Sequence, residues 1–447
     1  MLKVFNTDDP DTLKLKGLHW ANSFSTACYF DSNHYTDPYS AFDVFIAAGV
    51  KKDLNHSDKG SFDQLNHLLS ENHDFIPGYF AYDLKNQAED LYSLNPDHLG
   101  FQDIFFFLPL HSIQIKGNEV QITTDSPDAL WKVLNEYEIP KSANTTAKPK
   151  IQSRFSREEY INSVKEIQKH IQRGDIYELN FCQEFYAEKY CIDPLQVFIQ
   201  LNNISPTPFA NYFKINNYFI ISATPERFLS RRGNKLISQP IKGTSSRKSD
   251  IIQDEEQKNL LLKNEKERSE NVMIVDLVRN DLTKSAKAGT VKVEELFGLY
   301  SFKQVHQMIS TVVCEAKEGL SNTEIISNTF PMGSMTGAPK ISAMKLAEKY
   351  ERSKRGVYSG ALGYFAPNGD FDFNVVIRTI LYNADSNYLS FHAGSAITLD
   401  SEPEKEYDEC LLKGMAILEV LSLNTHCLSP VSGTSEQEKK QNTTALR

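Results

Sequence analysis

The chain has 447 residues, of which 40% are hydrophobic and 24% charged, and its formal net charge at pH 7 is −10. A chain of this length can bury a large core, and its negative charge argues against non-specific nucleic-acid binding, which needs a basic surface. No apolar stretch approaches the about eighteen residues of a membrane-spanning helix, and the N-terminal MLKVFNTDDP lacks the apolar core of a signal peptide.

Cysteine spacing and low-complexity segments predict the location and the domain boundaries. The six cysteines are scattered without a CxxC pair, which predicts reduced thiols in the cytoplasm rather than disulfides or a zinc site. The polar stretch 141–154 predicts a linker between an N-terminal region of mixed strands and helices, residues 1–140, and a larger region over 151–423. Residues 428–447 are polar and aperiodic, which predicts a disordered tail.

In chain order, the first clear strand-like segment is GYFAYDL, residues 78–84. After the linker, Ser156 and Glu159 form a capping box. The apolar spacing that follows predicts a helix that ends at Gly174. IYELNFCQEF, residues 176–185, then alternates as a strand does.

Hairpins and helices follow over the rest of the chain. Asn216-Asn217 and Gly233-Asn234 each separate two strand-like segments, which predicts two hairpins. Helical patterns then occupy three further segments: 250–275, 338–351 and 402–421. Successive hairpins interrupted by occasional helices predict an α+β fold, with antiparallel sheets and helices packed outside them.

Two helices carry pairs of carboxylates at helical spacing. Glu267 and Glu270 are three residues apart, as are Glu406 and Glu409, and Lys413 lies one turn beyond Glu409. A solvated charged face is the commoner explanation of either pair alone. Together, the two helices could hold one hard cation, because magnesium is usually bound by one or two carboxylates plus substrate oxygens.

Small-residue turns and one isolated cation suggest anion binding. GSMTGAPK, residues 333–340, lacks the spacing of a phosphate loop and predicts a tight turn into a helix that begins near Pro339. HAGSAIT, residues 392–398, is likewise expected to be a turn whose amides could meet a carboxylate. Arg378 ends an apolar strand and needs an anionic partner, either a protein carboxylate or a ligand.

A single lysine stands in QPIKGTSSR, residues 239–247, which the Pro and Gly predict to be a loop. Lys242 is either a solvated loop lysine or a nucleophile in a dry pocket. Glu226, at a strand edge, could be an acid facing a cleft, whereas His306 could equally be a core histidine. No Ser-His-Asp or reactive-cysteine pattern predicts a glutaminase.

Nine ordered segments over about 151–423 resemble the chorismate-utilising enzyme family. They are GDIYELNF, ATPERF, QPIKGTSSR, SENVMIVDLVRNDL, KAGTV with VHQMIS, GSMTGAPKISAM, YSGALGYF, NVVIRT, and AGSAIT with EPEKEYDE. The resemblance implies an intertwined sandwich of two antiparallel sheets with outer helices and a magnesium-dependent site between them.

The 239–247 segment discriminates between branches of this family. Its Pro-Ile-Lys-Gly-Thr resembles the branch that aminates chorismate at C4, whereas anthranilate-forming relatives typically have Pro-Ile-Ala-Gly-Thr. Isochorismate-forming relatives use a lysine in the strand equivalent to 176–182, where this chain has Glu178 in place of the glutamine expected in its nearest relatives. Anthranilate formation, isochorismate formation and an inactive partner-binding relative remain as alternatives.

The resemblance also implies roles for individual residues. Lys242 would be a covalent nucleophile toward C2 of chorismate and Glu226 the general acid for the departing C4 hydroxyl. The lysine, with an ordinary pKa of ~10.4, would need burial or nearby cations to be neutral. Mg²⁺ would be held by Glu270 and Glu409, supported by Glu267 and Glu406.

The remaining implied roles concern the substrate and a partner. His306 would help to position the ring, and the substrate-binding residues would be Gly243, Thr244, Thr336, Gly337, Tyr364, Arg378, Gly394, Ser395, Ala396 and Lys413. The implied transferase reaction makes 4-amino-4-deoxychorismate for 4-aminobenzoate and folate synthesis. Because no glutaminase pattern is present, a glutamine amidotransferase subunit is the implied source of ammonia.

Overall fold

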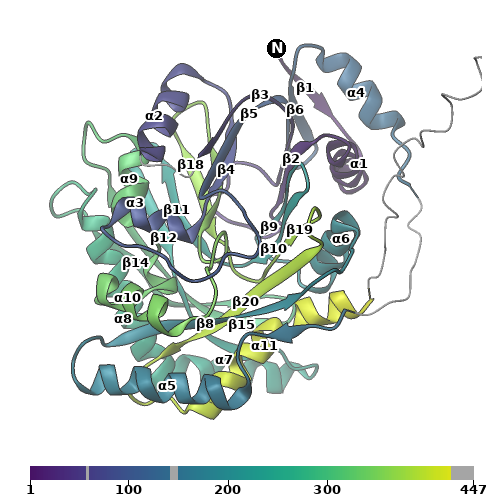
Figure 1. Cartoon of the computed structure of the whole chain (residues 1–447). Helices are drawn as coiled ribbons and strands as arrows, with labels where there is room; N and C mark the ends of the chain where they lie inside the picture. The colour runs from purple at the N-terminus through teal and green to yellow at the C-terminus, as the bar shows by residue number, and fades with distance from the viewer. Residues whose placement is uncertain (57–59, 141–148, 424–447) are drawn as a thin grey trace, which may run out of the picture.

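A computed structural model of the protein describes residues 1–56, 60–140 and 149–423 (Figure 1). The predicted tail, 428–447, and most of the predicted linker lie outside these residues. No helix in the described part of the chain is long and apolar enough to cross a membrane.

The structure combines antiparallel strands with peripheral helices, as the sequence predicts. The strands are β1 (Leu2–Asn6), β2 (Thr26–Asp31), β3 (Val44–His56), β4 (Ile76–Phe80), β5 (Ile104–Lys116), β6 (Glu119–Thr123), β7 (Gln152–Ser153), β8 (Glu178–Ala187), β9 (Phe209–Ile215), β10 (Tyr218–Thr224), β11 (Arg227–Arg232), β12 (Lys235–Gln239), β13 (Ile241–Ser246), β14 (Lys292–Ser301), β15 (Val305–Glu315), β16 (Gly337–Ala338), β17 (Ala361–Phe365), β18 (Phe371–Val375), β19 (Thr379–Asn383) and β20 (Tyr388–Ile397). The helices are α1 (Pro10–Asn22), α2 (Ser61–Glu71), α3 (Lys85–Ala88), α4 (Pro127–Glu136), α5 (Arg157–Gln172), α6 (Pro194–Ile204), α7 (Ile251–Lys263), α8 (Glu265–Thr283), α9 (Asn322–Thr329), α10 (Lys340–Tyr350) and α11 (Pro403–Leu423), with short 3-10 turns η1 (Tyr82–Leu84) and η2 (Gly333–Met335).

The strands form two antiparallel sheets that share one long strand. One sheet runs β3-β2-β9-β10-β19-β20-β8, and the other runs β4-β17-β18-β11-β12-β15, with β13 and β14 on β15. Strand β5 pairs with β3 and with β4 and so joins the two. This arrangement confirms the predicted α+β class with antiparallel sheets and outer helices.

The N-terminal region is built into the same sheets as the rest of the chain. Tyr29 of β2 lies opposite Tyr212 of β9, and Gly78 of β4 lies opposite Gly363 of β17. Residues 1–140 and 151–423 therefore share backbone hydrogen bonds in both sheets, in addition to side-chain contacts.

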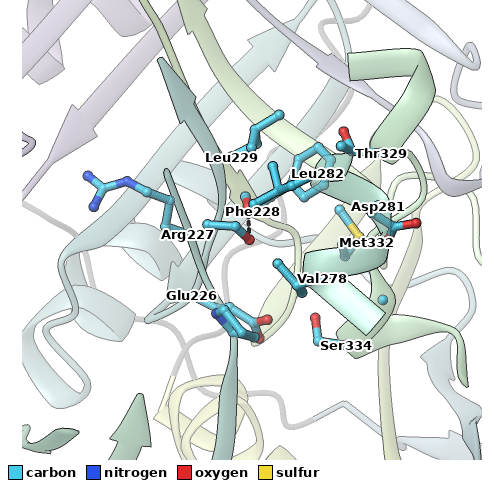
Figure 2. Close-up of a pocket in the computed structure, with 13 residues that line it drawn as sticks. Glu226, Arg227, Phe228, Leu229, Val278, Asp281, Leu282, Thr329, Met332 and Ser334 are labelled. Atoms are coloured by element: carbon cyan, nitrogen blue, oxygen red, sulfur yellow. Dashed lines mark hydrogen bonds between the residues drawn. The ribbon is translucent and has the colours of Figure 1, made fainter. Parts of the chain in front are cut away.

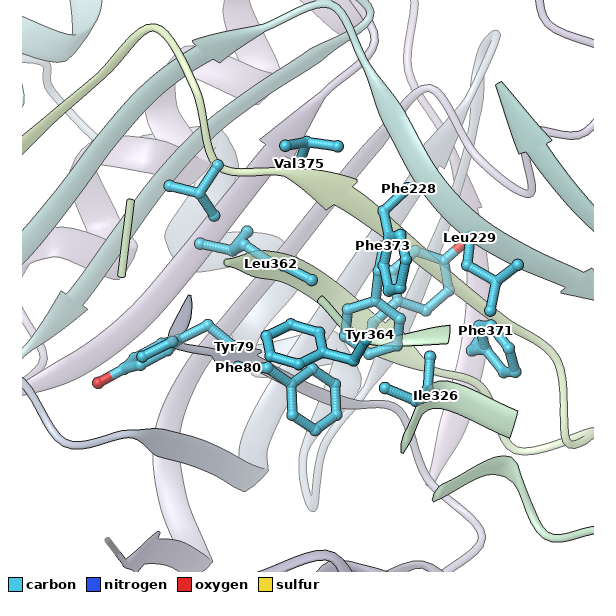
Figure 3. Packing of buried hydrophobic residues seen from close by; sticks show 14 of the residues in the cluster. Tyr79, Phe80, Phe228, Leu229, Ile326, Leu362, Tyr364, Phe371, Phe373 and Val375 are labelled. Carbon is cyan, nitrogen blue, oxygen red and sulfur yellow. The ribbon is translucent and has the colours of Figure 1, made fainter. Parts of the chain in front are cut away.

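Alternate residues of the strands pack into two hydrophobic clusters. Phe213 belongs to the cluster between the sheets, whereas its neighbour Tyr212 faces the cluster beneath the outer helices, as expected where successive side chains point to opposite faces. The first cluster is rich in aromatic rings (Figure 3), and the rings of Phe80 and Phe373 lie 5.3 Å apart. Each sheet is thus fixed on both faces.

Most predicted elements are present near their predicted positions. Ser156 and Glu159 form the capping box of α5, and both hairpins form, with Asn216 in the left-handed conformation at φ 51°. The predicted helix over 250–275 is instead two helices, α7 and α8, because Asn264 ends one and caps the next.

Two predicted turns are strands. Residues 239–247 include β13, which pairs with β15, and residues 392–398 fall mostly in β20, which pairs with β8. The glycine of the second segment serves close backbone approach instead: a side chain at Gly394 would meet the Phe181 carbonyl at 2.4 Å. These segments are strands because they pair with β15 and β8, which are distant in the sequence and cannot be recognised from the local pattern.

Candidate active site

Lys242 lies in a bulge of strand β13. The register against β15 shifts between Ile241 and Thr244, and Gly243 has φ +94°, a conformation that L side chains rarely adopt. From α8, the Asn271 amide donates to the Lys242 carbonyl at 3.4 Å, and its Oδ1 accepts from Ser310 Oγ at 2.7 Å. The bulge is therefore held by a buried side chain of the neighbouring helix.

The amine of Lys242 forms an ion pair with a carboxylate from the other sheet. Nζ donates to Oε1 of Glu178 on β8 at 2.9 Å, and the Glu178 side chain is only 1% exposed. Burial by itself would lower the pKa of Lys242, but Glu178, Glu270 and Glu409 outweigh it and raise that pKa above its ordinary value. The groups that act most strongly on this lysine are therefore acids, which favour its charged form, and not the cations that a neutral amine would need.

Glu226 lies at the junction of β10 and β11 and is 4% exposed. Burial raises its pKa to about 7, although Ser334 and the charge of Lys242 oppose the shift. Figure 2 shows its carboxyl and Ser334 in a pocket whose far end includes Asp281. A carboxyl with this pKa is protonated in part of the population at neutral pH and can act as an acid.

Carboxylates from α8 and α11 converge on one cation. The ammonium of Lys266 lies 3.7 Å from Glu270 and 3.5 Å from Glu406, and Glu267 and Glu409 also raise its pKa. Burial raises the pKa of Glu267, and that of Glu270 to about 7. Acids crowded and buried in this way favour a bound cation.

These carboxylates suit magnesium better than a metal caged by protein alone. Among the described residues, no group of three or more His, Cys, Asp or Glu side chains could hold a metal ion. A site that offers one or two carboxylates and leaves the other positions to water and substrate is the usual magnesium arrangement. Glu409, which is paired with Lys413 at 2.6 Å, would exchange that partner for the metal.

Arg378 lies between β18 and β19 with φ 53°, and not at the end of a strand as the sequence predicts; its Nη1 donates to the Lys413 carbonyl at 3.0 Å. In the part of the chain that the structure describes, it forms no ion pair with a carboxylate. Burial lowers the pKa of Arg378, and nearby Tyr358 opposes that shift. The charge of Glu409 opposes it as well, so both anionic partners considered from the sequence, a protein carboxylate and a ligand, remain open.

Tyr364 contacts aromatic rings and Arg232, whereas the phenol of Tyr358 acts on the charge of Arg378. The Tyr364 ring packs on Phe42 at 4.9 Å, and its hydroxyl interacts with Arg232. The segment YSGALGYF contains both tyrosines, and both belong to the hydrophobic cluster between the sheets. Tyr364 lies in β17, whereas Tyr358 precedes that strand, and the substrate-binding role of Tyr364 stays a prediction.

The other predicted substrate-binding residues line strand β8. Gly394, Ser395 and Ala396 pair with its residues 180–182. Gly337 approaches so closely that a side chain there would meet the Glu178 carbonyl at 2.2 Å. Thr336 is buried, and its hydroxyl donates to the Met332 and Gly333 carbonyls. Strand β8 therefore brings these segments to Glu178.

His306 and Thr244 have other environments. The two ring nitrogens of His306 contact Ser301 Oγ at 2.8 Å and Asp254 Oδ1 at 3.0 Å, and the side chain is 2% exposed. Both nitrogens are thus engaged within the protein, and the core-histidine alternative fits this ring better than a catalytic one. Thr244 is exposed on β13, next to Gly243.

The chain is similar to two kinds of known chorismate enzymes. The chain is 34% identical over 347 residues to aminodeoxychorismate synthase component 1 of Klebsiella aerogenes, covering 77% of this chain and 76% of that protein. It is 31% identical over 369 residues to anthranilate synthase component 1 of Thermus thermophilus, covering 78% and 77%.

A solved structure and a family match extend these similarities. The crystal structure of anthranilate synthase component I from Streptococcus pneumoniae superposes with a TM-score of 0.75 at 25% identity, covering 86% of this chain and 93% of that one. The sequence model of the chorismate binding enzymes matches residues 20–419, across the linker predicted at 141–154. The chain therefore belongs to the family of chorismate binding enzymes.

Proposed function

We propose that the protein is an aminodeoxychorismate synthase component 1, which converts chorismate and ammonia to 4-amino-4-deoxychorismate and water. The observation that carries the proposal is the bulge of β13, which presents the Lys242 amine between two acids, Glu178 at 2.9 Å and the buried Glu226. The relative from Klebsiella aerogenes carries this name. An amination of this kind belongs to the transferases and would supply 4-aminobenzoate for folate synthesis.

The proposed chemistry uses Lys242 as a nucleophile. Its neutral amine attacks C2 of the ring while the C4 hydroxyl departs with a proton from Glu226. Ammonia then attacks C4 and expels the lysine, so the enolpyruvyl group is retained. Burial keeps Glu226 protonated at a pH where an ordinary carboxyl is ionised.

Other residues bind and orient the substrate. Arg378 has the planar fork that pairs with a carboxylate in two hydrogen bonds, and the phenol of Tyr358 acts on its charge. Thr336, Gly337, and the strand residues Gly394, Ser395 and Ala396 border the same part of β8. Together they would hold the enolpyruvyl side of chorismate against Lys242.

Magnesium is the proposed cofactor. Glu270 and Glu409 would hold it, with Glu267 and Glu406 as supporting carboxylates, because these acids converge between α8 and α11. The bound ion would supply a positive charge for a carboxylate of the substrate. It would also offset the attraction that Glu270 and Glu409 exert on the proton of Lys242.

A glutamine amidotransferase subunit is the proposed source of ammonia. The name of the relative, component 1, supports a second component. The five cysteines among the described residues are free thiols, which supports a cytoplasmic location. The amidotransferase subunit and the cytoplasmic location are both proposed together with this reaction, and neither is tested independently of it.

A coupled assay tests the function. With chorismate, Mg²⁺ and ammonium, followed by 4-amino-4-deoxychorismate lyase, the protein should yield 4-aminobenzoate. Anthranilate without 4-aminobenzoate would instead identify an anthranilate synthase component 1, the alternative supported by the relative from Thermus thermophilus. Isochorismate formed without ammonium, or no turnover by folded protein, would also overturn the proposal.

A further inference from the structure

We propose that Glu178 is the base that removes the proton from Lys242 and returns it at the end of each catalytic cycle. The inference rests on the proposed function and deepens it, since it assigns a route for the one proton that the lysine must lose. The observation behind it is that one carboxylate oxygen of Glu178 accepts a hydrogen bond, whereas the other has no partner among the described residues.

Glu178 is fixed and dry. Its side chain is 1% exposed, and the backbone of β8 around it is paired with β16 and with β20, Ala338 lying opposite Glu178 and Ile397 opposite Leu179. Oε1 accepts from Lys242 Nζ at 2.9 Å, whereas Oε2 has no hydrogen-bond partner among the described residues. The carboxylate therefore has a free oxygen that can accept a further hydrogen bond or a proton.

The surroundings of Lys242 offer a local base. The carboxylates that act on its charge are those of Glu178, Glu226, Glu267, Glu270 and Glu409. Of these, Glu178 is the one with a hydrogen bond to Nζ in the described structure. Glu178, Glu270 and Glu409 favour the ammonium form, and Glu178 would remain as the acceptor at hydrogen-bonding distance once a bound ion offsets the other two.

The transfer balances in atoms and charge. An N–H bond of Lys242 breaks and an O–H bond forms on Glu178, so that an ion pair becomes two neutral groups. In a site that excludes water, neutralising the ion pair loses less solvation free energy than it would in solvent, because a buried site stabilises charges poorly. The freed electron pair of Nζ then forms the bond to C2.

The cycle closes with the same proton. As the C2–N bond forms, the C4 hydroxyl departs as water with the proton of Glu226. When ammonia bonds to C4, the C2–N electron pair returns to Nζ, and Lys242 recovers its proton from Glu178. The new ammonium group on C4 gives one proton back to Glu226, so chorismate and ammonia yield the product and water with no other reactant.

The decisive variant is Glu178→Gln, which keeps the shape and removes the basicity. In the wild type the proton stays within the pair, so formation of neutral lysine does not depend on pH. In the variant the proton must leave to water. We expect kcat to fall at least ~10²-fold at pH 7 and the variant-to-wild-type ratio of kcat to rise about tenfold per pH unit above it, with KM for chorismate unchanged. Taking the ratio at each pH cancels the changing ammonia concentration and the titration of Glu226.

A matched control lies on the same strand. Glu184 is 3% exposed and paired with Arg154 at 2.8 Å, so Glu184→Gln also removes a buried ion pair from β8. We expect its ratio to the wild type to be flat with pH. If the ratio of kcat for Glu178→Gln to that of the wild type is also independent of pH, whether kcat is lowered or not, the Lys242–Glu178 pair has only a structural role and the proposal is overturned.

Two further outcomes keep the inference separate from the function. If Glu178→Gln does not fold, Glu178→Asp decides: a pH-independent ratio supports the base, and a ratio that rises with pH overturns it. A wild type that makes no 4-amino-4-deoxychorismate overturns the proposed function itself. Amination by the wild type with an unaffected Glu178→Gln variant overturns the base alone.

Discussion

Arg378 and Lys413 are joined by a hydrogen bond of 3.0 Å, from the guanidinium of one to the backbone carbonyl of the other. The ammonium of Lys413 in turn donates to the Gly394 carbonyl at 2.8 Å and pairs with Glu409 at 2.6 Å. The start of β19, the middle of β20 and helix α11 are thereby fixed together. Two cations, one for a substrate carboxylate and one beside the proposed metal, share a single framework.

Arg378→Lys should weaken chorismate binding because lysine keeps the charge but cannot make two parallel hydrogen bonds. Losing one charge-assisted hydrogen bond, about 1.5–3 kcal/mol, predicts a rise in KM for chorismate of roughly 10- to 150-fold. Steady-state kinetics measure it. Arg279→Lys, an exposed position on α8 paired with Asp276, is the control, and equal KM values for both variants would contradict the assignment.

Lys242→Ala should abolish amination while leaving chorismate binding largely intact. The nucleophile is lost, whereas Arg378 and the proposed metal site remain. Product formation and calorimetric binding measure the two properties, and mass spectrometry of wild type with chorismate but no ammonium should detect an adduct on Lys242. Lys235→Ala, which breaks the pair with Glu294 at 2.8 Å, should retain activity. Turnover by Lys242→Ala would exclude the covalent route.

Glu226→Gln should lower kcat by ~10²- to 10⁴-fold, the usual contribution of a general acid. Burial raises the pKa of Glu226 to about 7, and the protonated form, present below that pKa, is the active one. The wild-type kcat should therefore fall as pH rises through about 7, and the variant should lack this limb. A pH–kcat profile measures both, and an unchanged limb in Glu226→Gln would assign it to another group.

Removal of Mg²⁺ by EDTA should abolish activity, and added Mg²⁺ should restore it. Glu270→Gln and Glu409→Gln should each raise the Mg²⁺ concentration needed, because each removes a ligand charge. A thermal shift with Mg²⁺ alone should report the same order, since a bound ion stabilises the folded state. Glu404→Gln, at an exposed position on α11, should behave as wild type. Full activity in EDTA would contradict a metal site.

Tyr358→Phe should raise KM for chorismate, whereas Tyr364→Phe should not. Tyr358 acts on the charge of Arg378, while Tyr364 packs against Phe42 and interacts with Arg232. The same chemical change is made at both positions, so the two variants control for each other. A larger effect at Tyr364 would support the role predicted for it from the sequence.

Local patterns predicted much of the fold and many of the site residues. The capping box of α5 and both asparagine-containing hairpin turns are short-range features whose physics acts within a few residues, and they formed as expected. The carboxylate pairs on α8 and α11 also follow from helical spacing alone. Their meeting at Lys266 required the two helices to pack together.

Sequence alone singled out the residues that we propose carry the chemistry: the lysine of 239–247, the acids around it and Arg378. Tertiary structure decided their states and partners. It turned two predicted turns into strands through pairing with β15 and β8, and it placed Glu178 against Lys242 from 64 residues away. Pairing register and burial are long-range properties, and they set the charge on Lys242 because neighbouring acids outweigh desolvation there.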